Sequence, residues 1–243
     1  MKKPELLYED EDIIVCVKPD GMPSQSDKSM TQDLESYWKK ELSEQAIKAG
    51  SPLSEPPFVS AVHRLDRPVG GVMVLAKNKQ AAAELSRQIK EHTMVKYYQA
   101  VVSGFLPDME GTYEDALIWD RKKNISRVVA SDTKEAKTTL LDYEVLDELE
   151  TDSGAFSYVL IRLETGRHHQ IRCQMAHHGN PIVGDLKYAP APKKTGGQKK
   201  QNIRQLALIS TRLEFAHPTT KEWMVYKTEP WGEGFALLDA EDF

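Results

Sequence analysis

The sequence His63-Arg64-Leu65-Asp66-Arg67 lies shortly before an apolar run, Val72-Met73-Val74-Leu75-Ala76. A short run of this kind predicts a buried strand, which puts Asp66 at the mouth of that strand. A carboxylate there can act as a nucleophile or general base, and the flanking arginines would keep it ionised. The alternative is that Arg64 and Arg67 form ordinary surface ion pairs, which contribute little. Local chemistry leaves both interpretations open.

The rest of the chain predicts helices and strands in no regular alternation, without an internal repeat. We therefore expect an α+β fold with a mixed, mostly antiparallel central sheet flanked by helices and loops. We expect one domain over residues 1–243, with a basic mobile loop at about 187–204. The predicted strands cover residues 13–17, 72–76, 95–102, 139–145, 157–163, 206–209 and 223–227. The predicted helices cover residues 31–48, 79–92 (with Asn78 as N-cap) and 168–178 (with Gly179 after the C-terminus).

Composition excludes several classes of protein. The chain has 243 residues, 40% hydrophobic and 28% charged, which is typical of a globular protein and not of collagen, a coiled coil or a disordered chain. Two cysteines, Cys16 and Cys173, are too few for a disulfide scaffold or a four-cysteine zinc site. No apolar run is long enough to span a bilayer, and the N-terminus lacks a signal core. We therefore expect no membrane association and a cytoplasmic protein.

Charge is unevenly distributed along the chain. The net charge is −5, which argues against a general polyanion binder. Residues 1–60 carry 7 Lys and Arg against 12 Asp and Glu, whereas residues 61–204 carry 22 against 18. The stretch from Lys187 to Arg204 holds six basic residues and no acid. Such a strip can meet a phosphate backbone, but charge alone favours a solvated surface loop.

Two further stretches carry candidate binding residues. In Thr165-Gly166-Arg167-His168-His169-Gln170-Ile171-Arg172, a turn delivers basic residues to a predicted helix start, which suits a phosphate or carboxylate. A capped helix with polar first-turn residues is the simpler alternative. In the predicted strand 95–102, Tyr98 shares a face with Lys96, and an aromatic beside a cation can stack a base and hold its phosphate. A core tyrosine is the simpler alternative there.

The histidines do not form a recognisable metal motif. No pair has the HExxH arrangement, and no cysteine or acid stands at ligand spacing. We therefore expect no metal.

Taken together, these motifs resemble the RluA-type family of RNA pseudouridine synthases. His63-Arg64-Leu65-Asp66-Arg67 matches the family's H-R-L-D-R/K signature, and further motifs follow in the family's order across nearly the whole chain. The first motif continues as Pro68-Val69-Gly70-Gly71, where many members have Ser or Thr before a single glycine. Many members also carry an extra N-terminal RNA-binding domain, for which we expect no room here. The other matching stretches are Lys96–Gly104 (K-x-Y-x-A-x-V-x-G), Gly166–Arg172 (G-R-x-H-Q-I/L-R) and Gly179–Asp185 (G-x-P-I/L-x-G-D).

The resemblance implies an RNA pseudouridine synthase that isomerises uridines in ribosomal or transfer RNA. It implies that Asp66 is the catalytic carboxylate, that Arg172 pairs with it and that Tyr98 stacks on the target base. It also implies that Arg64 fills the gap left by the extruded nucleotide or contacts phosphate, with Arg167 and His63 in phosphate contact or loop support. No metal, redox cofactor or nucleotide cofactor is implied, and we expect a monomer. The alternatives are a catalytically idle RNA-binding protein on the same fold and a metal-dependent hydrolase.

Overall fold

The computed structural model describes residues 2–27, 31–152, 154–189 and 203–237. The chain divides into two compact units, each of which is described by itself. The first unit contains residues 1–95 and 210–228, and the second contains residues 96–209 and 229–243. The described residues form three α-helices and eleven strands, which confirms the predicted α+β fold with a mixed, mostly antiparallel sheet. The single catalytic domain stays a prediction.

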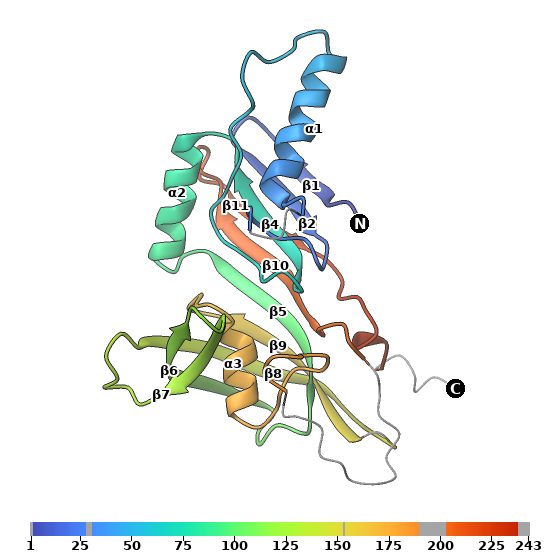
Figure 1. Ribbon diagram of the computed structural model, residues 1–243, viewed down its shortest axis with the longest axis vertical. Helices are drawn as coiled ribbons and strands as arrows, with labels where there is room; N and C mark the ends of the chain where they lie inside the picture. Colours follow the sequence, from blue (N-terminus) through green and yellow to red (C-terminus); the bar gives the residue numbers. More distant parts are fainter. Residues whose placement is uncertain (1, 28–30, 153, 190–202, 238–243) are drawn as a thin grey trace. The chain divides into compact units, whose positions relative to one another are not determined.

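The first unit is built on antiparallel strand pairs (Figure 1). Strand β2 lies between β1 and β4, β3 adds a short pairing to β4, and β11 pairs with β10. Two helices accompany these strands. The elements are β1 (Glu5–Glu9), β2 (Ile13–Lys18), α1 (Leu34–Lys48), β3 (Ser60–Ala61), β4 (Gly70–Ala76), α2 (Lys79–Lys90), β10 (Leu208–Ala216) and β11 (Trp223–Lys227).

Every residue of β2 is buried, because elements pack against both of its faces. Ile13 and Val15 belong to a core cluster with Ala81 and Leu85 of α2. Cys16 has the opposite parity along the strand, and the Trp38 Nε1–H of α1 donates to its Sγ over 3.3 Å. The two faces of β2 therefore pack against two different helices.

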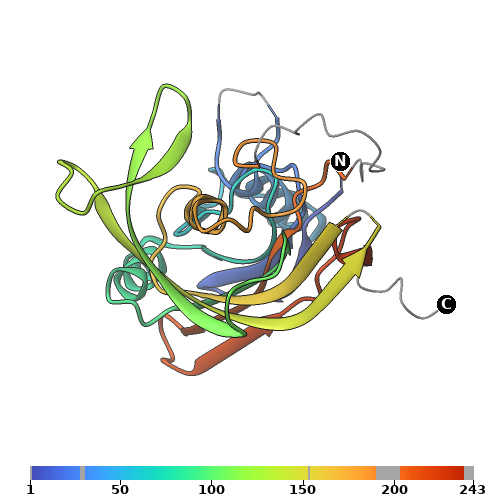
Figure 2. The same cartoon turned by 90° about the horizontal axis from the view of Figure 1, so that it is seen from below.

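The second unit is a strongly curved antiparallel sheet in the order β5-β9-β8-β6-β7. Helix α3 lies on the concave side of these strands (Figure 2). The elements are β5 (Val95–Ser103), β6 (Glu110–Asp120), β7 (Ile125–Val129), β8 (Lys137–Thr151), β9 (Gly154–Leu163) and α3 (Gln170–His177). The first two residues of β10 also belong to this unit.

The segment after α3 returns to β5. Gly179 has φ +95°, the left-handed conformation expected of the residue that ends a helix. The Ser103 N–H then donates to the Pro181 carbonyl over 2.9 Å, and the Val183 N–H donates to Val101 over 2.9 Å. These bonds hold the segment that leads to Asp185 alongside β5.

Most predicted elements are confirmed, and the differences have local causes. Helix α1 begins at Leu34 rather than residue 31, because the Asp33 carboxylate caps it by accepting the Ser36 N–H. Helix α3 begins at Gln170 rather than residue 168, because His169 adopts a left-handed φ of 51°. Strand β10 continues to Ala216, beyond the predicted end at 209. Strands β1, β3, β6 and β7 were not predicted, and most of the predicted basic loop (190–202) lies outside the described residues.

Both cysteines are buried and reduced, one in each unit. Burial raises the pKa of the Cys16 thiol to about 12 and that of Cys173, on α3, to about 11. Both thiols are therefore protonated at neutral pH. None of the described helices is long and apolar enough to cross a membrane.

Gly71 provides a test of how tightly β4 and β10 pack. A Cβ at Gly71 would lie 2.2 Å from the Ser210 carbonyl oxygen, and φ is +126°. Gly154 has almost the same φ, +127°, but no atom within 4 Å of its Cβ position. We expect Gly71→Ala to lower the free energy of unfolding by about 3 kcal/mol or more, since backbone strain and a backbone clash add.

The matched control is Gly154→Ala, which carries only the backbone strain of about 1–3 kcal/mol. Chemical denaturation of both variants measures the difference. Equal losses at the two positions would show that strand β10 moves away from Gly71 at no cost.

Candidate active site

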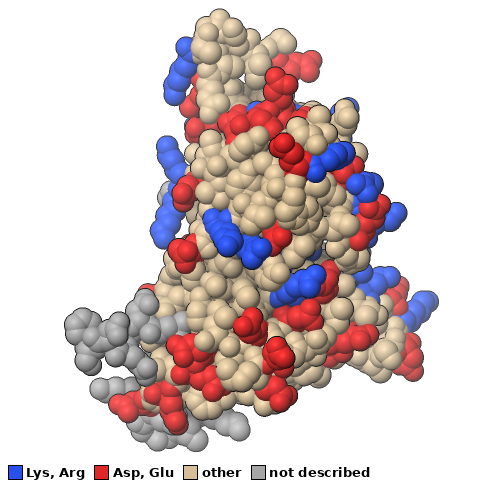
Figure 3. Space-filling view, turned by 180° about the vertical axis from the view of Figure 1, so that it is seen from behind, with Lys and Arg blue, Asp and Glu red and all other residues tan. Residues whose placement is uncertain are grey.

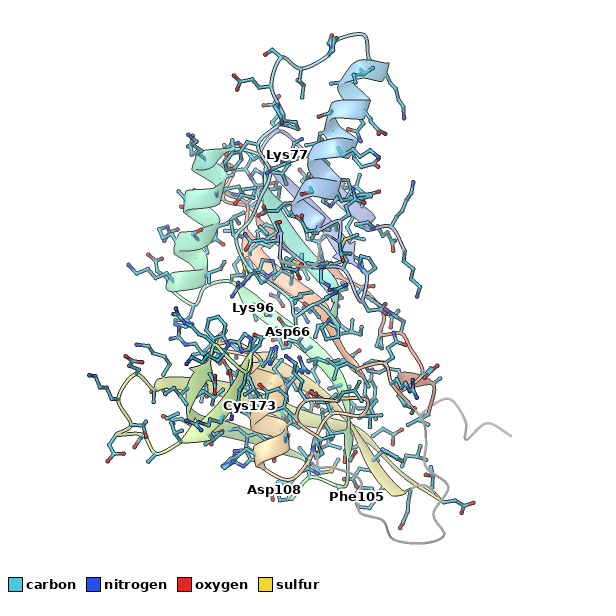
Figure 4. The ribbon with its side chains drawn as sticks, in the orientation of Figure 1. Asp66, Lys77, Lys96, Phe105, Asp108 and Cys173 are labelled. Carbon is cyan, nitrogen blue, oxygen red and sulfur yellow. The ribbon has the colours of Figure 1, made fainter. Side chains whose placement is uncertain are left out.

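The Asp66 turn (residues 63–69) joins β3 to β4 in the first unit, and its backbone is held from several directions. The Ser24 hydroxyl donates to the Leu65 carbonyl over 3.0 Å and accepts the Leu65 N–H over 3.1 Å. The Val69 N–H closes the turn on the Asp66 carbonyl over 2.9 Å. Asp66 itself is half-buried (Figure 4). The carboxylate is therefore carried by a rigid turn and not by a free loop.

Lys18 is the buried cation beside this turn, and the sequence analysis missed it. Its side chain is fully buried at the end of β2, and Nζ donates to the carbonyls of Met22 (2.6 Å) and Pro19 (3.1 Å), with a longer contact to Arg67 (3.5 Å). Burial lowers the pKa of the Lys18 ammonium to about 7, while the charges of Asp20 and Asp66 act to raise it. Lys18 and Asp66 therefore attract one another.

The basic residues around Asp66 have different surroundings. Arg67 is anchored, with Nε donating to the Gly21 carbonyl over 3.0 Å and Nη2 to Thr31 over 3.2 Å. His63 Nε2 accepts the Val74 N–H of β4 over 3.2 Å, which gives it a role in supporting the turn. Arg64 is exposed and makes no hydrogen bond or ion pair to any residue that the structure describes. Arg64 is thus available to a ligand.

Arg172 lies on α3 in the second unit and is 5% exposed. It forms a bidentate ion pair with Asp185, with Nε–Oδ2 at 2.7 Å and Nη2–Oδ1 at 2.9 Å. Asp185 Oδ1 also accepts the N–H groups of Lys187 and Tyr188, and the guanidinium lies 5.4 Å from the centre of the Tyr188 ring. Asp185 therefore orients Arg172, a role the sequence analysis did not assign. The pairing of Arg172 with Asp66 stays a prediction.

The turn before α3 is held by Gln170, not by its arginine. Gln170 Oε1 accepts the Thr165 hydroxyl (2.9 Å) and the Arg167 N–H (3.0 Å), and its Nε2 donates to the Leu140 carbonyl (3.2 Å). Arg167 is exposed, and among the described residues its guanidinium has no hydrogen-bond partner. Tyr98 lies on β5, opposite Ile161 of β9, and is 6% exposed.

The β6–β7 hairpin carries an exposed aromatic and basic cluster that the sequence analysis also missed. The Trp119 ring stacks on His168 at 4.6 Å, and the Arg121 guanidinium lies over Trp119 at 5.3 Å. Lys122 and Lys123 follow at the exposed tip. Exposed acids of the same unit lie on β8 (Glu144, Asp147, Glu148 and Glu150) and at the start of β6 (Glu110 and Glu114). Many acidic side chains are visible in the lower part of the face that Figure 3 shows. Among the described residues of the second unit, the tip of this hairpin offers cations and a stacking ring to a polyanion.

Three of the histidines contact a carboxylate or a hydroxyl of a neighbouring side chain. His217 Nε2 contacts Asp10 (2.8 Å), and His178 Nε2 contacts Asp115 (3.0 Å). His169 Nδ1 is 3.0 Å from the Tyr188 hydroxyl, and burial with the Arg172 charge lowers the His169 pKa to about 2. In the described parts of the chain, no three His, Cys, Asp or Glu side chains are arranged to hold a metal ion.

Comparison with known proteins assigns the family. The model of the RNA pseudouridylate synthase family matches residues 12–177. The tRNA pseudouridine synthase C of Vibrio parahaemolyticus is 31% identical over 98% of this chain and 96% of its own length. The dual-specificity RNA pseudouridine synthase RluA of Pasteurella multocida is 30% identical over 93% of both chains. Human RNA pseudouridylate synthase domain containing 4 shares the fold, with a TM-score of 0.71 at 22% identity over 93% of this chain and 88% of its own. The chain therefore belongs to the RNA pseudouridine synthase family.

Proposed function

We propose that this chain isomerises uridine to pseudouridine in RNA, with Asp66 as the catalytic carboxylate. The observation that carries the proposal is the Asp66 turn. The Ser24 hydroxyl bonds both the carbonyl and the N–H of Leu65, and the buried Lys18 ammonium attracts the Asp66 carboxylate. Preorganisation of this kind is what a group that must act on one atom of a substrate requires. A carboxylate that served only solubility would not need it.

The reaction needs no outside reagent, since its atoms and electrons balance within the substrate. The N1–C1′ bond of the uridine breaks, the base turns, and a C5–C1′ bond forms. C5 loses a proton and N1 gains one. Asp66 acts at the ribose, on C1′ or on the C2′ proton. The proposal accordingly includes neither a metal nor a redox or nucleotide cofactor.

The other predicted site residues take roles that fit their surroundings. Arg172, oriented by Asp185, is proposed to pair with Asp66 and keep it ionised and aligned. Tyr98 is proposed to stack on the target base, a contact that contributes about 1–3 kcal/mol. The exposed side chains of Arg64 and Arg167 are proposed to contact the extruded nucleotide or its phosphates, and His63 to support the turn.

The proposed substrate is transfer or ribosomal RNA. The Vibrio parahaemolyticus relative is named for tRNA, and a Neisseria meningitidis relative, 30% identical over 96% of this chain and 60% of its own length, is a ribosomal large subunit pseudouridine synthase. The Trp119 and Arg121 cluster on the β6–β7 hairpin supports binding to a nucleic acid, because it pairs a stacking ring with cations. The proposal takes the protein to be a cytoplasmic monomer.

Asp66→Asn is expected to abolish product formation while folding and RNA binding stay nearly intact, because only the charge is removed. Pseudouridine is mapped across the transcriptome of the source organism with the gene intact, deleted, or deleted and complemented by wild type or the variant. One or a few uridines should lose modification, and only wild type should restore them. The matched control is Asp108→Asn, an exposed carboxylate of the second unit. Multiple turnover by Asp66→Asn would show that Asp66 is not the catalytic carboxylate.

Tyr98→Phe is expected to keep RNA affinity within about twofold, since the stacking ring remains. We propose that the Tyr98 hydroxyl also takes part in moving the proton lost from C5, so the single-turnover rate should fall by roughly 10²-fold. Tyr97→Phe is the control, because Tyr97 points to the opposite face of β5. A full rate for Tyr98→Phe would leave Tyr98 as a stacking platform alone.

Asp185→Asn tests whether Asp185 works through Arg172. The substitution removes half of a buried ion pair, and such losses cost about 3–5 kcal/mol of stability. We expect a slower single-turnover step at saturating RNA, with a smaller change in RNA affinity. In a double-mutant cycle with Arg172→Lys, the two losses should not add, since both disturb one guanidinium. Additive losses would show that Asp185 serves the fold independently of Arg172.

A further inference from the structure

Lys96 is a buried cation that pairs with no residue in the described part of the chain. It stands at the start of β5 (Figure 4). It is only 8% exposed, and its Nζ makes no hydrogen bond or ion pair with any described residue. The carboxylate that most affects it, Glu164, forms an ion pair with Arg162 at 2.8 Å. Burial lowers the pKa of the Lys96 ammonium, against the opposing effect of Glu164. A fold gains no stability from a buried ammonium in this state, so its presence needs another explanation.

Gly166 lies next to this ammonium. Gly166 is exposed and does not adopt the left-handed conformation that only glycine accepts easily. A Cβ built on Gly166 would meet a single atom within 4 Å, the Lys96 Nζ at 3.7 Å. Neither backbone conformation nor packing therefore demands glycine at this position. A side chain at position 166 would instead lie against the Lys96 ammonium.

The neighbours of Lys96 indicate the kind of ligand. Tyr98 follows two residues later, so the two side chains project from one face of β5 about 7 Å apart along the strand. Exposed Arg167 follows Gly166 directly. An aromatic ring, a buried ammonium and an exposed guanidinium fit the base and phosphates of one nucleotide stretch better than they fit an isolated small anion.

We propose that Lys96 binds a backbone phosphate of the RNA next to the base held by Tyr98, through an opening that Gly166 keeps free. The inference rests on the proposed function and adds a binding residue to it. Lys96 is placed in substrate binding and not in the chemical step. The free-energy cost of burying the Lys96 ammonium falls on the unliganded protein, because the ammonium is already desolvated before the phosphate binds.

The first experiment measures binding without turnover. Fluorescence anisotropy follows a labelled oligouridylate with wild type, Lys96→Met, Gly166→Ala and the control Lys90→Met, an exposed lysine on α2. We expect Lys96→Met to weaken binding roughly tenfold, as for a lost hydrogen bond to a charged group. Its salt slope should fall by about 0.7, as for one phosphate on a single strand. Gly166→Ala should weaken binding by a smaller factor, and Lys90→Met should leave it unchanged.

Thermal unfolding separates this role from a structural one. Lys96→Met should melt at the same temperature as wild type or higher, since it replaces an unpartnered buried charge with an apolar chain of similar length. A lower melting temperature with unchanged RNA affinity would overturn the proposal in favour of a structural lysine. Gly166→Ala keeps the test valid if Lys96→Met fails to fold, and unchanged affinity in Gly166→Ala would also count against the proposal.

The second experiment identifies the phosphate. In an RNA that the wild-type chain modifies, single linkages around the target uridine are replaced by neutral methylphosphonates. One linkage should weaken wild-type binding but have no effect on Lys96→Met. Equal sensitivity of both proteins at every linkage would assign Lys96 to a base contact instead. Because oligouridylate binding needs no product, a wild type that binds but forms no pseudouridine would refute the proposed function and leave the phosphate site standing.

Discussion

The Lys18 ammonium is the constraint on which the first unit's site depends. It is fully buried, and its three donor directions reach carbonyls from the turn after β2 and from the Asp66 turn. Because a buried ammonium must keep its acceptors, these two turns cannot move apart without exposing an unsatisfied charge. Ser24 adds a second connection through Leu65. The position of Asp66 is thus determined by backbone groups, which are insensitive to changes in neighbouring side chains.

In the second unit, a different interaction fixes the position of the candidate site residue. There a guanidinium, Arg172, is fixed by a carboxylate, Asp185, that the chain delivers after α3 by pairing residues 181–183 with β5. A bidentate pair fixes direction as well as distance, which a single lysine contact does not. Lys96 on β5 is the exception in this unit, since no described group balances it. Lys18 and Arg172 are thus charges that stabilise the local structure, whereas Lys96 is a charge that no described group of the protein neutralises.

The sequence predicted the elements whose burial is continuous and missed those whose burial is not. Strands β2 and β4 are buried along their whole length and were predicted, whereas β6 has only two buried residues, Tyr113 and Leu117. Strand β10 continues for seven residues beyond Ile209 because Ser210 and Thr211, though polar, are buried within it. The apolar run in the sequence ends at Ile209, whereas the strand continues to Ala216.

Candidate site residues divide in the same way. Asp66, Arg172 and Tyr98 stand in motifs of several residues, which a sequence can carry. Ser24 and Asp185 act through bonds to residues 41 and 13 positions away, Leu65 and Arg172. Lys18 reaches Arg67, 49 positions away, in addition to its near neighbours in the sequence. No periodicity or local spacing encodes such partners. Lys18 directly follows the predicted strand 13–17, but the burial of its side chain depends on tertiary packing.

The distribution of the two cysteines has a further consequence. Cys16 lies in the first unit and Cys173 in the second, both buried and both with raised pKa values. A protonated, inaccessible thiol reacts with an alkylating reagent only when the structure around it opens. Each unit therefore contains one natural reporter of its own local unfolding. The rates at which the two thiols are labelled would rank the units by the free energy of opening, without any engineered probe.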